Sequence, residues 1–303
     1  MNHTPKTLIV IAGPTAVGKT AVAIKLAQQL KTDIVSADSR QFYREMSIGT
    51  AKPDAVELSL AKHYFVNSHS ITENFTVGDF EKQALQLLDG LFKTHDKVIM
   101  AGGSGLFIQA ITQGFDELPV ADTIVREKLN QQLAEKGIQF LQEQLKIADP
   151  VYYEQVDLNN PQRLIRALEV FETTGKPFSS YRKAATNKRP FQTIKVGLKL
   201  PREILYHHIN QRVDIMVKQG LVEEVKSLLP YRSLNALNTV GYSELFDYFD
   251  GKTDLITAIE LIKQNTRRFA KRQLTWFRKD KDIKWFMANE PALIDLIRKE
   301  LLY

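Results

Sequence analysis

The chain reads Gly13-Pro14-Thr15-Ala16-Val17-Gly18-Lys19-Thr20 between a short apolar segment and an amphipathic one. Residues 7–12 form a β-branched and aliphatic run that ends at a glycine, which predicts a buried strand. Residues 21–30 carry apolar side chains at helical spacing, which predicts a helix. Because a strand and a helix flank the Walker A pattern G-x-x-x-x-G-K-T, we interpret the octapeptide as a phosphate-binding loop.

Each part of this loop can hold phosphate in its own way. Successive backbone N–H groups point inward around phosphate oxygens, and the following helix adds the positive end of its dipole. Lys19 supplies a positive charge, and the Thr20 hydroxyl can coordinate Mg²⁺. The loop alone leaves open whether the phosphates belong to a nucleotide. The sequence lacks a convincing hydrophobic run ending in Asp-Glu, the usual ATPase companion of the loop, which weakens the ATPase interpretation.

Two other polar segments follow predicted strands. Asp38 stands after an apolar run at 34–37, and Gly102-Gly103-Ser104-Gly105 closes a run at 98–101. The carboxyl ends of strands in open α/β sheets gather around the ligand, so both segments are candidates for the site. Asp38 can bind Mg²⁺, orient a nucleophile or accept a proton, but Asp38 is equally a good helix cap. The glycines admit a ligand and Ser104 offers a hydroxyl, although a plain strand-to-helix turn fits the same residues.

The order of these elements predicts an α/β fold with a mostly parallel sheet. After Pro119 the pattern changes, because residues 121–181 show helical periodicity without a convincing strand. A returning strand is predicted at 193–200. We therefore predict a core formed by residues 1–118 and 200–303, with an inserted all-helical domain at 119–199.

Composition excludes several kinds of site. None of the 303 residues is a cysteine, which rules out disulfides, thiolate nucleophiles and cysteine-based zinc or iron–sulfur sites. No stretch approaches the roughly 20 apolar residues that a membrane span needs. We therefore expect a soluble, cytoplasmic protein without a membrane partner.

The placement of charge matters more than the net charge of +6. Residues 182–202 hold seven basic side chains and no acid, and residues 263–281 hold eight with one acid. In the second cluster Arg268 and Arg272 share a helix face and Trp276 follows, an arrangement that can grip phosphates and stack bases. The clusters indicate a polyanionic partner, but two solvated surfaces explain the same charges.

With these residues in view, the chain resembles the bacterial tRNA dimethylallyltransferases, also called tRNA isopentenyltransferases. The Asp-Ser-x-Gln and Ala-Lys-Arg-Gln-x-Thr-Trp segments are far more specific than the phosphate loop. The matching segments follow the family's order over nearly the whole chain, at residues 13–20, 38–44, 48–53, 102–106, 161–170, 240–242 and 266–276.

The resemblance implies an unusual use of the loop. It would bind the diphosphate of dimethylallyl diphosphate, together with Mg²⁺, in place of a nucleotide. The dimethylallyl group would move to the exocyclic amine of the adenosine just 3′ of a tRNA anticodon, releasing diphosphate. The resemblance also implies a P-loop core like that of a nucleotide kinase, with an inserted helical domain that holds the anticodon stem-loop. We expect a monomer.

The resemblance assigns residues to these roles. Asp38 is the expected general base, Ser104 lies at the family's reacting centre, and Arg212 contacts the diphosphate. The diphosphate ligands would be Gly13, Pro14, Thr15, Ala16, Val17, Gly18, Lys19 and Thr20, and Thr20 would also bind the metal. The expected tRNA contacts are Asp38, Ser39, Arg40, Gln41, Ser104, Arg126, Gln162, Arg163, Leu164, Ile165, Arg166, Lys271 and Arg272.

Some positions depart from the family's pattern. Ser104 and Phe107 stand where threonine and tyrosine are usual, so the hydroxyl is kept at the first and lost at the second. His208 replaces an expected arginine ahead of Arg212, which lowers the fixed positive charge near the diphosphate or makes it depend on pH. Residues 64–67 replace a usual histidine and aspartate, and we assign no function there.

Three other functions use the same features differently. A small-molecule or nucleotide kinase would turn over ATP and would not need basic clusters that grip RNA. A non-catalytic, nucleotide-switched RNA-binding protein would need the clusters but not Asp38. An adenylate isopentenyltransferase would modify free nucleotide, and the segment 162–166 and the inserted domain argue against it.

Overall fold

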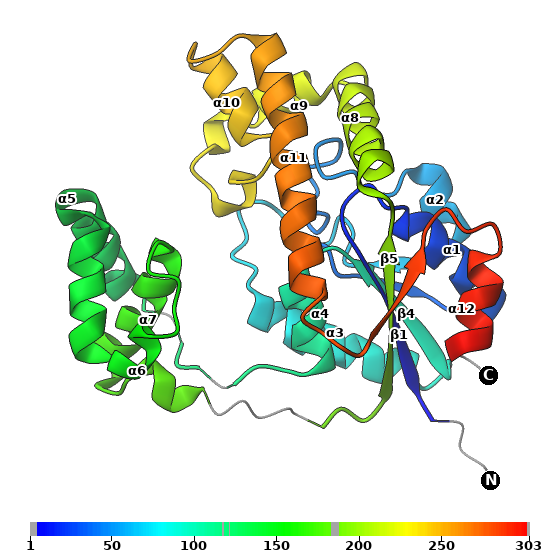
Figure 1. The fold of residues 1–303 in the computed structure, drawn as a ribbon, viewed down its shortest axis with the longest axis horizontal. Coiled ribbons are helices and arrows are strands. Elements are labelled where there is room, and N and C mark those ends of the chain that lie inside the picture. Colours follow the sequence, from blue (N-terminus) through cyan, green and yellow to red (C-terminus); the bar gives the residue numbers. More distant parts are fainter. Residues whose placement is uncertain (1–4, 117, 121, 183–187, 302–303) are drawn as a thin grey trace. The chain divides into compact units, whose positions relative to one another are not determined.

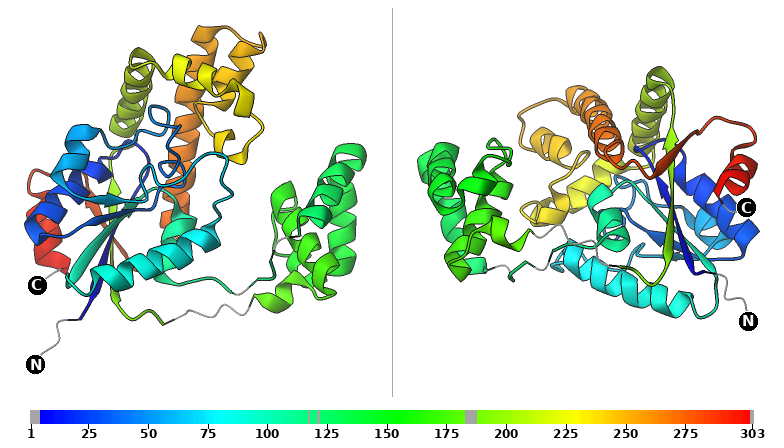
Figure 2. Two further views of the ribbon diagram at one scale, coloured as in Figure 1. Left: turned by 180° about the vertical axis from the view of Figure 1, so that it is seen from behind. Right: turned by 60° about the horizontal axis from the view of Figure 1, so that its bottom comes forward.

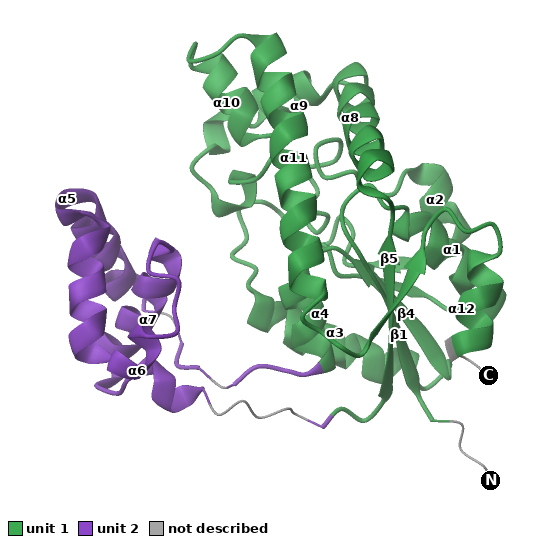
Figure 3. Ribbon diagram, viewed as in Figure 1, with its two compact units in different colours: residues 1–112, 189–303 green, residues 113–188 purple. Residues whose placement is uncertain are grey.

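The computed structural model describes residues 5–116, 118–120, 122–182 and 188–301. The chain forms two compact units, drawn in green and purple in Figure 3. Unit 1 comprises Met1–Thr112 and Arg189–Tyr303, and unit 2 comprises Gln113–Lys188. Unit 2 is thus an insertion in unit 1, as the change of sequence pattern after Pro119 predicts.

A six-stranded parallel sheet forms the centre of unit 1, with the strand order β3-β2-β4-β1-β5-β6. The strands are β1 (Thr7–Ala12), β2 (Ile34–Ser36), β3 (His63–Tyr64), β4 (Lys97–Gly102), β5 (Gln192–Lys199) and β6 (Ile283–Met287). The α/β prediction is confirmed. Because β5 pairs with β1, residues 192–199 belong to the core, and the insertion ends earlier than the expected boundary at 199.

Helices cover the sheet and extend one end of unit 1 (Figure 1). They are α1 (Lys19–Leu30), α2 (Ala55–Leu60), α3 (Val77–Leu91), α4 (Gly105–Thr112), α8 (Arg202–Lys218), α9 (Leu221–Ser227), α10 (Ser243–Phe249), α11 (Leu255–Phe277) and α12 (Leu293–Leu301). Short 3₁₀ turns η2 (Leu229–Tyr231) and η3 (Asn235–Leu237) lie between α9 and α10.

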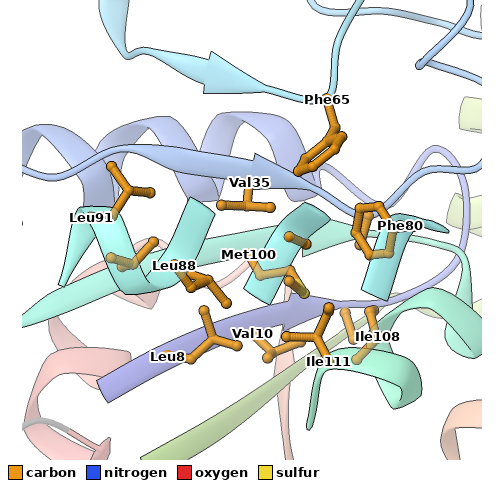
Figure 4. Close-up of a cluster of buried hydrophobic side chains, with 14 of the residues drawn as sticks. Leu8, Val10, Val35, Phe65, Phe80, Leu88, Leu91, Met100, Ile108 and Ile111 are labelled. Carbon is orange, nitrogen blue, oxygen red and sulfur yellow. The ribbon is translucent and has the colours of Figure 1, made fainter. Parts of the chain in front are cut away.

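Successive residues of β1 belong to two different hydrophobic clusters, because side chains alternate between the faces of a sheet. Leu8 and Val10 pack in a cluster with side chains of α3 and α4, which Figure 4 shows. Ile9 and Ile11 pack with side chains of α1, α8 and α12 instead. Figure 2 shows these helices from two further sides. Burial on both faces explains why the strand is an unbroken apolar run.

A third cluster lies beyond the carboxyl end of the sheet. It joins α9, α10 and the start of α11 to Tyr43 and Met46 from the segment that follows β2. Tyr242 at its centre is fully buried. This packing attaches the segment after Asp38 to the C-terminal helices.

Unit 2 consists of α5 (Thr123–Ala148), α6 (Pro150–Tyr153), α7 (Pro161–Thr174) and the 3₁₀ turn η1 (Phe178–Tyr181), with no strand among its described residues. Asp122 caps α5 by accepting from the N–H of Ile124 at 2.9 Å, and Asn160 caps α7. Gly175, with φ 70°, ends α7. The all-helical character predicted for the insertion is confirmed. Across the described residues of both units, no helix is long and apolar enough to span a membrane.

Candidate active site

The carboxyl ends of three neighbouring strands bring the sequence motifs together. The phosphate loop leaves β1, Asp38 follows β2, and β4 lies between them and leads into Ser104. The N–H of Ser104 donates to the carbonyl oxygen of Ala37 at 3.2 Å. A Cβ atom at Gly102 would lie 2.1 Å from the same oxygen, so glycine is needed for this approach. The expected meeting of the three segments at one sheet edge is observed.

The phosphate loop has the backbone that its sequence predicts. Gly18 adopts a left-handed φ of 98° immediately before α1, a conformation that glycine takes without steric penalty. The Lys19 ammonium donates to the carbonyl oxygen of Pro14 at 2.8 Å and so reaches back across the loop. Arg212 on α8 donates to the Thr15 hydroxyl at 3.4 Å, which places a second cation at the same loop.

The charges of Lys19, Asp38 and Arg212 act on one another. Burial lowers the pKa of Lys19 to about 8, while the nearby Asp38 carboxylate raises this pKa and Arg212 lowers it. Burial also lowers the pKa of Arg212, and Asp38 opposes that shift. Two desolvated cations beside one carboxylate leave an excess of positive charge, which suits an anionic group such as diphosphate.

A magnesium ion fits this loop only together with a bound diphosphate. Among the described residues, no group of three or more His, Cys, Asp or Glu side chains could hold a metal ion. Mg²⁺ commonly keeps several waters and takes one or two protein ligands together with substrate phosphates. The Thr20 hydroxyl, next to Lys19 in the first turn of α1, therefore suits an ion that arrives with a diphosphate.

Asp38 and Ser104 are joined through Ser39. The Asp38 carboxylate accepts from the N–H of Arg40 at 3.0 Å within a turn, and no helix begins there, so the interpretation as a helix cap is wrong. Ser104 Oγ accepts from the N–H of Ser39 at 3.0 Å and donates to Ser39 Oγ at 3.2 Å. The Ser104 hydroxyl thus holds the turn that presents the Asp38 carboxylate.

Arg40 and Gln41 make contacts within the protein. The Arg40 guanidinium donates to the carbonyl oxygens of Asn235 and Asn238, both at 3.2 Å. The Gln41 amide donates to the carbonyl oxygens of residues 50 and 51 and accepts from Ser36. Both side chains fix the backbone on either side of the Asp38 turn, and their contact with tRNA stays a prediction.

The outer face of α11 is basic and aromatic. We define this α11 face as Arg268, Phe269, Lys271, Arg272 and Trp276, which are all exposed. The Arg272 guanidinium lies 5.8 Å from the centre of the Phe269 ring. A Cβ atom at Gly105 would lie 2.2 Å from the Trp276 ring, so this face adjoins the segment that carries Ser104.

The arginines of unit 2 differ from one another. Arg126 and Arg166 pair with Glu169, whose carboxylate is fully buried, at 2.9 and 3.2 Å. Arg163 and Gln162 are exposed in the first turn of α7. Two of the three predicted arginine contacts therefore already balance a buried charge inside the unit.

The expectation for Leu164 and Ile165 needs correction. Their side chains are 0% and 1% exposed and lie in the hydrophobic cluster of unit 2. They pack against other apolar side chains there, so they offer no side-chain contact to tRNA.

Known proteins share this sequence and architecture. The family model described as IPP transferase matches residues 41–280. The chain belongs to this family. It is 56% identical over 296 residues to the tRNA dimethylallyltransferase of Christiangramia forsetii, covering 97% of this chain and 98% of the relative. The phosphate loop and Asp38 precede the region that the IPP transferase model matches.

Solved structures of IPP transferases extend the agreement to the fold. The tRNA isopentenylpyrophosphate transferase of Bacillus halodurans superposes with a TM-score of 0.72 at 35% identity, covering 98% of this chain and 96% of that one. A eukaryotic dimethylallyltransferase acting on tRNA gives a TM-score of 0.77 at 26% identity, covering 98% and 77%. The core and the insertion together therefore have the fold of a known tRNA isopentenylpyrophosphate transferase.

The departures from the family's pattern have local explanations in two cases. Phe107 packs against Phe42 and Phe80, with ring centres 5.4 and 5.0 Å away, so an apolar ring suits its place. Within the segment 64–67, Asn67 accepts from the Lys52 ammonium at 2.6 Å and has a structural role. His208 is exposed on α8, one turn before Arg212.

Two polar side chains were missed by sequence reasoning. Gln273 contacts both the phosphate loop and Gly103, although it lies within a recognised segment. Glu224 accepts from the N–H groups of residues 47, 48 and 49 and from the Tyr242 hydroxyl. Nothing local in the sequence indicates these long-range contacts. Gln273 lies within the family segment 266–276, whereas Glu224 lies outside every segment that carries the resemblance.

Proposed function

We propose that this chain transfers the dimethylallyl group of dimethylallyl diphosphate to the exocyclic amine of the adenosine 3′-adjacent to the anticodon in tRNA. One observation carries the proposal. The phosphate loop, Asp38 and Ser104 meet at the ends of three neighbouring strands in a chain of the IPP transferase family. The names of the relatives supply the two substrates. We further propose that the enzyme acts as a monomer in the cytoplasm, with Mg²⁺.

The chemical step exchanges one bond for another. The bond between the allylic carbon and the diphosphate oxygen breaks with its electron pair on oxygen, and the amine lone pair forms the new carbon–nitrogen bond. The amine proton passes to the Asp38 carboxylate. An adenine amine is a poor nucleophile because its lone pair is delocalised into the ring, so a positioned base matters here.

The leaving diphosphate gathers negative charge during this step. Lys19, Arg212 and the loop N–H groups other than that of Thr15, which donates to Gln273, stabilise that charge in a site where protein has replaced water. When bound through Thr20 and the phosphate oxygens, Mg²⁺ would add positive charge at the same group.

The RNA is recognised by two kinds of contact. The target adenosine leaves its stack to reach Asp38, and the exposed rings of the α11 face suit stacking with bases. Lys271, Arg272 and Arg163 suit phosphates, which position an RNA without reading its sequence. The two units are proposed to bind the same anticodon stem-loop.

Transfer can be measured directly with radiolabelled dimethylallyl diphosphate and unmodified tRNA. Label in the tRNA is the expected result, and a tRNA with guanosine in place of the target adenosine serves as the control. Label in free adenosine nucleotide would identify an adenylate isopentenyltransferase instead. ATP turnover without label transfer would identify a kinase, and tRNA binding without either reaction would identify a non-catalytic protein.

The affinity for the donor is expected to fall as the pH rises above about 8. The pKa of Lys19 is about 8 in the free protein, so at higher pH a growing share of the protein has lost this charge. Binding of diphosphate must then recover a proton, which weakens it by up to about tenfold per pH unit. Calorimetry across this range should show the slope. In Lys19→Arg, which keeps its charge, donor affinity should depend less on pH. An unchanged pH dependence in that variant would contradict the role of the Lys19 charge in donor binding.

Arg163 and Arg166 should respond differently to charge reversal. Arg163→Glu is expected to raise the Michaelis constant for tRNA and to lower the salt slope by about 1, because one phosphate contact is lost. Arg166→Glu should instead lower the thermal stability of unit 2, since Glu169 would then face another carboxylate. A normal salt slope for Arg163→Glu would remove Arg163 from the proposed RNA contacts.

A further inference from the structure

Gln273 joins the two loops on which the proposed reaction depends. Its side chain is 7% exposed on α11. Its carboxamide oxygen accepts from the N–H of Thr15 at 2.9 Å, and its carboxamide nitrogen donates to the carbonyl oxygen of Gly103 at 3.0 Å. One buried side chain thus bridges the loop after β1 and the loop after β4.

The carboxamide of Gln273 satisfies both partners at once. The backbone N–H of Thr15 can only donate, and the carbonyl oxygen of Gly103 can only accept, so the bridge needs one acceptor and one donor. Glutamate at position 273 would set two acceptors against each other, and methionine would make neither bond. The orientation of the Gln273 amide follows from the same requirement.

The glycines of the second loop make room for this helix. A Cβ atom at Gly103 would lie 2.4 Å from the Gln273 amide nitrogen, and one at Gly105 would lie 2.2 Å from the Trp276 ring. Gln273 and Trp276 are three residues apart on α11 and therefore face the same loop. The glycine segment and the last turns of α11 are complementary parts of one contact.

Each end of the bridge lies next to a reacting group. Thr15 belongs to the phosphate loop, and its hydroxyl receives the Arg212 contact. Gly103 precedes Ser104, whose hydroxyl holds the Asp38 turn through Ser39. A shift of one loop relative to the other would therefore change the distance between the leaving diphosphate and the base.

We propose that Gln273 is a positioning residue that fixes the donor loop relative to the loop of the proton acceptor. The inference rests on the proposed function, because it concerns the geometry of transfer. The Gln273 carboxamide bonds backbone groups of both loops, so its role is to position them. Its loss leaves each substrate its own ligands but misaligns the allylic carbon and the amine, and a misplacement of about 1 Å can cost on the order of 10²-fold in rate.

Steady-state kinetics of Gln273→Met separate this role from binding. We expect kcat for transfer to tRNA to fall roughly 10- to 100-fold, while the tRNA Michaelis constant and the calorimetric Kd for inorganic diphosphate change less than about threefold. Gln264→Met is the matched control, because Gln264 is exposed earlier on the same helix, and it should behave as wild type.

A double-mutant cycle tests the bridge itself. Gly103→Ala places a methyl group where the Gln273 amide nitrogen lies, so it should displace the amide and reproduce the loss in kcat. Once the bridge is broken, the second change removes nothing more, and the double variant should be no slower than the slower single variant. Gly103→Ala also keeps the test available if Gln273→Met does not fold.

Two outcomes would overturn the positioning role. One is a wild-type kcat for Gln273→Met or Gly103→Ala, and the other is a double variant whose loss is the product of the single losses. Wild-type protein runs in the same series. If it transfers no label to tRNA, the proposed function fails, whereas an active wild type with an unaffected Gln273→Met rejects the bridge alone.

Discussion

Asp38→Asn is expected to lower kcat for transfer to tRNA by roughly 10²–10⁴-fold, the usual contribution of a general base. Asparagine keeps the size of the side chain and can still accept the N–H of Arg40, as the carboxylate does at 3.0 Å. It cannot take the amine proton. Single-turnover transfer of the radiolabelled donor measures the step, and tRNA binding by the same variant should stay close to that of wild type.

The matched control for this variant is Asp33→Asn. Asp33 lies just before β2, at the opposite end of the strand from Asp38, so the same substitution there is remote from the phosphate loop. It should leave transfer nearly unchanged. Asp38→Asn with near-wild-type turnover would mean that another group or water accepts the proton.

The parts of the site that sequence predicts are those that local rules govern. The phosphate loop needs only a strand, a glycine turn and a helix in succession, and all three lie within residues 7–30. Asp38 and Ser104 were placed at the same edge because parallel strands end together. The helix caps Asp122 and Asn160 are equally local, because each side chain accepts from an N–H group within three residues.

The parts that were missed depend on contacts distant in sequence. Gln273 meets Thr15 across 258 positions, and no periodicity reports such a pairing. The strand β3 has two residues, too few for an alternating pattern, and β6 follows a long helical region that hides it. The end of the insertion was misplaced because β5 was counted with the insertion, although it pairs with β1.

A match to a family motif does not distinguish buried residues from exposed ones. Leu164 and Ile165 were grouped with Arg163 and Arg166 because the segment as a whole matches the family. In the structure the two apolar side chains are buried, and Arg166 neutralises Glu169. Helical periodicity within α7 separates the buried positions 164 and 165 from the exposed position 163.

Lys19→Met is expected to lower kcat/KM for dimethylallyl diphosphate by roughly 10²–10³-fold, the range measured when one donor to a developing negative charge is removed. The ammonium lies across the loop, 2.8 Å from the carbonyl oxygen of Pro14, where the diphosphate would leave. Arg212 remains at the loop, so the loss should be incomplete. Transfer measured at subsaturating donor gives kcat/KM, and tRNA affinity should not change.

We do not expect a loss of folding to cause this result, because burial disfavours the charged form of Lys19 in the folded protein. Its pKa is about 8 in the folded protein against 10.5 for the free side chain, so burial disfavours the charged form. Below pH 8 Lys19 is protonated in both the folded and the unfolded chain, so the full cost of burying its charge lowers the stability of the fold. This cost fades as the pH rises towards 10.5. Lys19→Met removes the penalty, and its thermal midpoint at pH 7 should be no lower than that of wild type.

Lys25→Met, at an exposed position of the same helix, controls for the substitution. Normal kcat/KM in Lys19→Met would show that the loop binds the donor without this charge, and a lowered midpoint would contradict the desolvation of Lys19.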